Sequence, residues 1–158
     1  MRKRVVFICL VVAAVALLCS CQSKDPTNGK TPLPRDIAAE IVEKGEFPEM
    51  LEMELDIVQK KYGLDKALLE SCSVYICSSG AQADEVAVFK AVDANAVKTI
   101  KKSVEKRAET VYTDFVDYVP GEIPKVDDHI IITKGNYVFF VIAAQPKSAQ
   151  QIFERYFN

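Results

Sequence analysis

The chain has 158 residues, of which 20 are basic and 22 are acidic, and its formal net charge is −2 at pH 7. Nucleic-acid binding draws on an excess of basic residues, so this balance argues against a nucleic-acid partner. The length suits one domain with a hydrophobic core of its own, next to a short terminal segment.

The first twenty-one residues have the pattern of a lipoprotein leader. Basic residues at positions 2–4 precede an apolar run over 5–18, and the small Ser20 stands directly before Cys21. These are the marks of an export signal with a cleavage site. A helix of fourteen residues spans only ~21 Å, less than the ~30 Å hydrocarbon core that a membrane-spanning helix must cross. We therefore predict a signal peptide over 1–20 and lipidation of Cys21.

The segment that follows has the composition of a tether. Residues 22–34 are polar and rich in Pro and Gly, which is typical of a flexible linker. Removal of residues 1–20 leaves 17 basic and 22 acidic residues, a net charge of −5. Such a chain has no electrostatic reason to adhere to an anionic bilayer. We expect the lipid alone to hold the protein at the extracytoplasmic face of the membrane, with residues 35–158 as a single domain.

The sequence of the first half of this domain predicts short helices followed by a hairpin. Asp36 is a suitable N-cap for a helix that ends at Gly45. Two further short helices are expected over 55–62 and from Asp65 to Leu69. Apolar runs at 74–77 and 86–89 predict two strands joined by a polar loop.

The second half repeats this order of elements. After the N-cap Asp93, apolar residues recur every three or four positions as far as Tyr118, which predicts a long amphipathic helix. Strands over 130–132 and 137–143 form a second hairpin through a turn at Gly135, and Pro146 begins a last helix. Two strand-strand-helix units indicate an α+β fold: a mainly antiparallel four-stranded sheet, with both unit helices on one face, preceded by the short N-terminal helices.

One strand of this sheet is apolar on both sides. Residues 138–144 do not alternate with polar ones, whereas a strand of a sheet with one wet face should alternate. The second face must therefore be covered, either by the helices of residues 36–70 or by a partner or second copy of the chain. A homodimer is therefore one of the partner arrangements that the sequence leaves open.

The two cysteines of the domain predict neither a disulfide nor a metal pair. Cys72 and Cys77 lie five residues apart in one expected strand, so their side chains point to opposite faces. We interpret both as small buried apolar residues.

Two polar clusters are candidates for chemistry. His129, the single histidine, stands beside Asp127 and Asp128 at the entry to a strand. A histidine with adjacent acidic residues suggests a general base or a metal ligand. A metal site needs three or four converging ligands, so a solvated turn is the favoured interpretation. Residues 78–80, Ser-Ser-Gly, resemble an anion-binding loop but lack the following helix and lysine, which favours a plain hairpin turn. We predict no cofactor and no metal.

Three segments carry a resemblance to a known family. They are residues 74–90 (VYICSSGAQADEVAVFK), residues 47–50 (FPEM) and residues 133–138 (TKGNYV). Together they resemble the domain of unknown function 4358, found in lipoproteins of Gram-positive, largely anaerobic bacteria. The resemblance spans residues 36–157 and implies a membrane-anchored surface protein. It implies no activity.

These observations favour a lipid-anchored binding or protein-interaction module for an unknown protein or small molecule, without evident catalysis. The candidate contact residues are two tyrosines of the sheet and the first hairpin loop: Tyr75, Tyr137, Ser78, Ser79 and Gly80. The alternative is a cell-envelope hydrolase or metal-dependent enzyme that uses His129 with Asp127 and Asp128.

Overall fold

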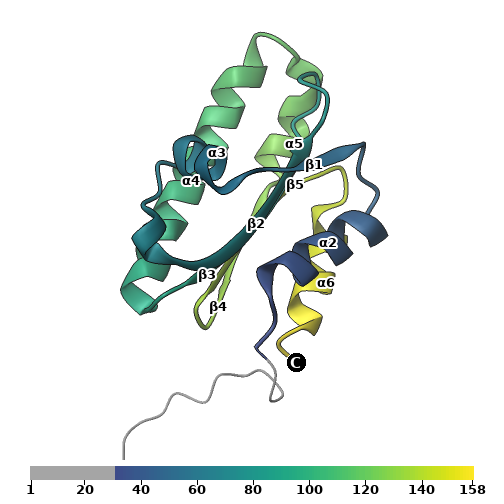
Figure 1. Cartoon of the computed structure of the whole chain (residues 1–158). Coiled ribbons are helices and arrows are strands. Elements are labelled where there is room, and N and C mark those ends of the chain that lie inside the picture. Colours follow the sequence, from purple (N-terminus) through teal and green to yellow (C-terminus); the bar gives the residue numbers. More distant parts are fainter. Residues whose placement is uncertain (1–30) are drawn as a thin grey trace, which may run out of the picture.

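A computed structural model describes residues 31–158 (Figure 1). The predicted signal peptide, Cys21 and most of the predicted tether lie outside these residues. The chain enters the domain at helix α2 (Pro34–Lys44). We expected Asp36 to cap this helix, but it lies in the first turn, because Pro34 supplies the fixed φ that suits a helix start. An acidic residue in the first turn is favourable beside the positive end of the helix dipole.

The sheet has five antiparallel strands in the order β1-β2-β3-β5-β4. Their bounds are Met50–Glu52 for β1, Leu69–Cys77 for β2, Glu85–Ala91 for β3, Ile130–Lys134 for β4 and Tyr137–Ile142 for β5. The prediction of four strands is therefore wrong by one, while the α+β class and the antiparallel pairing are confirmed. The additional strand, β1, has only three residues, too few to show a period, and it pairs with the end of β2.

The remaining helices follow the predicted order, with one addition. Helix α3 is Leu55–Tyr62, α4 is Ala94–Val116 and α6 is Pro146–Arg155, with a 3₁₀ turn at Lys66–Leu68. Asp93 caps α4 as predicted, because its carboxylate accepts hydrogen bonds of 2.8 Å from the amides of Asn95 and Ala96. The addition is a 3₁₀ turn, Pro120–Glu122, that leads into the short helix α5 (Ile123–Asp127).

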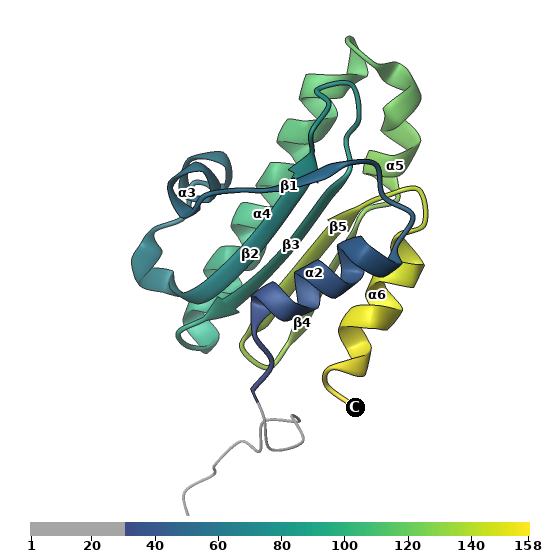
Figure 2. The same cartoon turned by 45° about the vertical axis from the view of Figure 1, so that its right-hand side comes forward.

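Helices cover both faces of the sheet (Figure 2). Alternate residues of β5 divide between two cores: Phe140 packs with α3 and α4, whereas Phe139 packs with α2 and α6. The expectation that both unit helices share one face is thus wrong, since α4 and α6 lie on opposite faces. The expected cover from residues 36–70 is correct for α2, but α3 lies on the α4 face. No helix within residues 31–158 has the length and apolarity needed to cross a bilayer.

The cysteines of β2 are both free, as predicted. Cys72 is half-buried and packs against the α4 core, and burial raises the pKa of its thiol. Cys77 is buried near the end of the strand. A raised pKa keeps the Cys72 thiol protonated at neutral pH, which fits the interpretation of an unreactive core residue.

Candidate functional site

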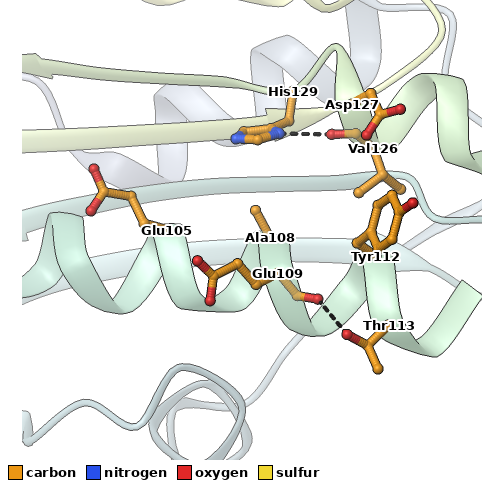
Figure 3. Close-up of a pocket in the computed structure, with 8 residues that line it drawn as sticks. All are labelled: Glu105, Ala108, Glu109, Tyr112, Thr113, Val126, Asp127 and His129. Carbon is orange, nitrogen blue, oxygen red and sulfur yellow. Dashed lines mark hydrogen bonds between the residues drawn. The ribbon is translucent and has the colours of Figure 1, made fainter. Parts of the chain in front are cut away.

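A pocket of the described chain lies between α4, α5 and the start of β4 (Figure 3). Its volume is about 440 Å³. Its lining comes from one stripe of α4 and from the segment 126–129 (Glu105, Ala108, Glu109, Tyr112, Thr113, Val126, Asp127 and His129). We call this the α4–α5 pocket.

Helix periodicity explains how α4 supplies its share of the lining. Residues 105, 108, 109, 112 and 113 are three or four positions apart, so they form one stripe along the helix. This stripe runs beside the buried stripe of Ile100, Val104 and Val111. Helix α5 packs against α4 through the buried Val126, and thereby turns a helix surface into the wall of a hollow.

His129 is held in one orientation at the edge of the pocket. Its Nδ1 lies 2.7 Å from the carbonyl oxygen of Val126 (Figure 3). A carbonyl oxygen only accepts, so Nδ1 carries the proton in this bond and Nε2 is the acceptor in the neutral ring. The ring also meets Phe140 edge to face, with centroids 5.9 Å apart. The imidazole is therefore oriented by its neighbours, and no hydrogen bond within residues 31–158 engages Nε2.

The pocket has a negative rim around a partly apolar floor. Glu105, Glu109 and Asp127 contribute carboxylates. Lys101 pairs with Glu105 at 3.5 Å, whereas Glu109 and Asp127 make no ion pair within the described chain. Tyr112 adds an aromatic ring that is 41% exposed. This combination suits a ligand that presents a positive charge beside an apolar group.

The structure separates the three residues of the predicted catalytic or metal cluster. Asp127 and His129 line the α4–α5 pocket, but Asp128 lines a second pocket of about 430 Å³ beside Ile130 and the start of α6. Successive residues at a strand entry point to opposite faces of the sheet, which explains the division. Within residues 31–158, no group of three or more His, Cys, Asp or Glu side chains could hold a metal ion.

The predicted loop Ser78-Ser79-Gly80 is exposed, and its two serine hydroxyls form hydrogen bonds within the protein. The Ser78 hydroxyl donates to Glu49 at 3.2 Å, and the Ser79 hydroxyl accepts from the amide of Ala81 at 3.2 Å. Ser79 and Gly80 line a small pocket of about 150 Å³ whose floor includes Arg107. The loop shares no lining residue with the α4–α5 pocket.

The two predicted tyrosine contacts lie on the α2 and α6 face and do not meet. Tyr75 is half-buried opposite Val86 on β3, and burial with the Glu52 carboxylate raises its pKa. Tyr137 is 4% exposed near the other end of β3, opposite Lys90, and its hydroxyl donates to the carbonyl of Pro32 at 2.7 Å. The five candidate contact residues therefore do not form one site, and both tyrosines serve packing.

Beside the small pocket lies a buried polar cluster that was not predicted from the sequence. Glu85 is 2% exposed on β3, and it accepts hydrogen bonds from Arg107 of α4 and from the hydroxyl of Tyr62 of α3. Burial lowers the pKa of Arg107, but the charge and hydrogen bond of Glu85, together with the charges of Tyr62 and Asp114, outweigh burial and raise the pKa overall. Burial and the Glu85 charge also raise the pKa of Tyr62. One signal was present: Arg107 stands on the buried stripe of α4, four residues before Val111 and three after Val104.

The architecture defines the class of protein as an α+β domain, with one antiparallel sheet enclosed by helices on both faces. A family model for the domain of unknown function DUF4358 matches residues 43–143. The chain belongs to this family, and the match contains all five strands together with α3, α4 and α5. Neither a curated protein nor a solved structure matches the chain.

Proposed function

We propose that this protein is a binding module, held at the extracytoplasmic face of the membrane by a lipid on Cys21, with the α4–α5 pocket as its ligand site. The observation that carries the proposal is the pocket itself: a hollow of about 440 Å³ in which an exposed aromatic ring lies near two carboxylates that make no ion pair within residues 31–158. The ligand class that fits is a protein segment or small molecule with a positive charge beside an apolar group.

The position of the pocket supports this arrangement. The chain enters the domain at α2, on one face of the sheet, and the pocket lies on the opposite face, which α4 and α5 cover (Figure 2). A tether that leads from α2 to the membrane leaves the pocket turned away from the bilayer. From Cys21 to Pro34 the chain reaches at most ~45 Å when extended, enough to separate the domain from the lipid surface.

The anchor is tested by substitution of Cys21, with the nearby Cys19 as the control position. We expect the wild-type chain to partition into detergent with a diacylated N-terminal cysteine, and Cys21→Ser to lose the modification and the partitioning, because only a thiol at the cleavage site accepts the glyceride. Cys19→Ser is the matched control and should stay lipidated. Mass spectrometry of the N-terminal peptide reads the result. An intact leader on the wild-type protein would contradict the proposal.

The pocket is tested by photo-crosslinking of the full chain in its native membrane. A benzophenone amino acid in place of Tyr112 should capture a ligand, and the charge reversals Glu109→Lys and Asp127→Lys together should remove the adduct, because they reverse the charge of the rim. The same probe at Lys98, an exposed position nearer the start of α4, is the control. Mass spectrometry of the adducts is the measurement. Equal labelling from both positions, unchanged by the charge reversals, would refute a ligand site here.

One observation favours the enzyme alternative: the ring of His129 is held in one orientation near Asp127, and its Nε2 makes no hydrogen bond within the described part of the chain. The enzyme alternative differs from the binding proposal in its dependence on the imidazole. Stoichiometric metal in the purified protein that disappears in His129→Ala, or a phenotype lost with His129→Ala and kept with Glu109→Lys, would favour the enzyme.

A further inference from the structure

The outer edge of β4 is open and apolar in the described chain. Among residues 31–158, β4 is the last strand of the sheet and pairs only with β5. Ile130, Ile131 and Ile132 follow one another along it and are only half-buried. Exposed edge strands of soluble proteins are usually protected by charges, prolines or bulges, because their free backbone groups bind other strands. Here the charged residues lie only at the two ends, Asp128 and Lys134.

The backbone groups that face outward can be assigned from the neighbouring strands. The amide of Ala91 donates to the carbonyl of Asn136 at 2.8 Å, while Lys90 lies opposite Tyr137. In an antiparallel ladder this pattern directs the backbone groups of Tyr137 toward β4. Because backbone groups alternate along a strand, the N–H and C=O groups of Lys134, Ile132 and Ile130 then point toward β5. The amides of Ile131 and Thr133 are left facing outward.

Hollows adjoin the first residues of β4 on both faces of the sheet. The α4–α5 pocket reaches His129 on one face, and the second pocket reaches Asp128 and Ile130 on the other. Helix α6 is anchored over β5 through Phe153, which stacks on Phe139 with centroids 4.7 Å apart. The edge is therefore approachable at its start, where a strand that pairs with it would find space on either face.

The segment 128–134 (DHIIITK) is complementary to itself when two copies run antiparallel. With Ile131 opposite Ile131 of a second copy, the outward amides face one another. Ile130 then lies opposite Ile132, and Asp128 opposite Lys134, each twice. Opposite charges across an antiparallel pair stabilise it and like charges destabilise it. A parallel arrangement would put Asp128 near Asp128 and Lys134 near Lys134, and is disfavoured.

We propose that a second copy of this chain docks on the β4 edge, and that the two sheets join across a two-fold axis at Ile131 into one continuous sheet. An axis perpendicular to the sheet puts α2 of both copies on the same side, so both N-terminal segments leave toward one surface. The pairing consumes the β4 edge of each copy, which closes the dimer and prevents growth into a filament. It does not depend on the function proposed for the α4–α5 pocket.

The test is native mass spectrometry of the full-length chain released from detergent at about 100 μM, a concentration at which a weak specific pair is populated. We expect the wild type as a dimer. Lys134→Asp should raise the dissociation constant by about tenfold or more, because it replaces two attractions by two repulsions. The swap Asp128→Lys with Lys134→Asp should restore the dimer. Lys102→Asp, on the exposed side of α4, is the matched control and should stay dimeric.

Thr133→Pro provides a second test without a change of charge. Its amide faces outward, and proline is tolerated in an edge strand where the amide has no partner within the sheet. We expect a folded monomer, with folding checked by circular dichroism. A wild type that stays monomeric overturns the proposal, as does a dimer that survives both Lys134→Asp and Thr133→Pro. Failure of the charge swap to restore pairing overturns the Asp128–Lys134 register.

Discussion

Replacement of Arg107 by methionine is expected to lower the free energy of unfolding by about 3–5 kcal/mol, the usual cost of breaking a buried ion pair. Arg107 donates to Glu85 through Nε at 3.2 Å and through Nη2 at 2.8 Å, and Glu85 is 2% exposed. The substitution leaves a carboxylate buried without its cation. Only the Tyr62 hydroxyl would still donate to it. Urea denaturation followed by circular dichroism measures the effect.

Two further variants separate the ion pair from other effects of the substitution. Lys106→Met changes the neighbouring, exposed residue of α4 in the same way and should shift stability by less than about 0.5 kcal/mol. The double variant Glu85→Met with Arg107→Met should recover much of the loss, because it leaves no unpaired charge in the core. If Arg107→Met were no more costly than Lys106→Met, the pair would not be a buried ion pair in solution.

Replacement of Phe153 by alanine is expected to cost about 3–5 kcal/mol of unfolding free energy, the range for loss of a buried phenylalanine. Phe153 is fully buried between the sheet and the C-terminus, where it stacks on Phe139 and contacts Phe157 with centroids 4.8 Å apart. Its removal leaves a cavity in the core on the α2 and α6 face. The same denaturation measurement reads the result.

The control for this substitution is Gln151→Ala, an exposed position on the same helix, which should be nearly neutral. The comparison also tests whether α6 is needed for the stability of the domain, because α6 lies beyond residues 43–143, which match the family model. A large effect at Phe153 shows that α6 is an integral layer of this domain. A small effect would mean that the sheet face is stable without it.

Several elements could be predicted from local pattern because their signals are local. Helix α4 repeats its apolar residues over many turns and begins with the side-chain cap of Asp93. Strand β5 is apolar at both parities, and this alone required that both faces of the sheet be covered. The structure confirms that α2 takes part in this cover.

Other elements were predicted wrongly because they depend on contacts between distant segments, which no local sequence pattern encodes. Strand β1 is three residues long and exists because β2 offers it an edge. Leu69, the first residue of β2, was predicted as the end of a helix, yet it pairs with Ala91 of β3 beside a register shift. An apolar stripe shows that a helix must be buried, but not against which face, so the opposite placement of α4 and α6 could not be foreseen.

The candidate site shows the same division between local and tertiary information. Its α4 residues, Glu105 and Glu109 among them, have the sequence character of a solvated helix face. They line a pocket only because α5, which was not predicted, packs beside them. His129 was singled out from the sequence, but its separation from Asp128 depends on which side of the sheet each residue faces.

Local sequence patterns predict the class of fold, the order of most elements and the need for two covered sheet faces, because periodicity and helix caps act between near neighbours in the chain. Tertiary contacts produce the fifth strand, the face that each helix covers, the buried pair of Glu85 and Arg107, and the pocket. Each of these depends on contacts between segments far apart in sequence, where the energy comes from burial that no single segment can report.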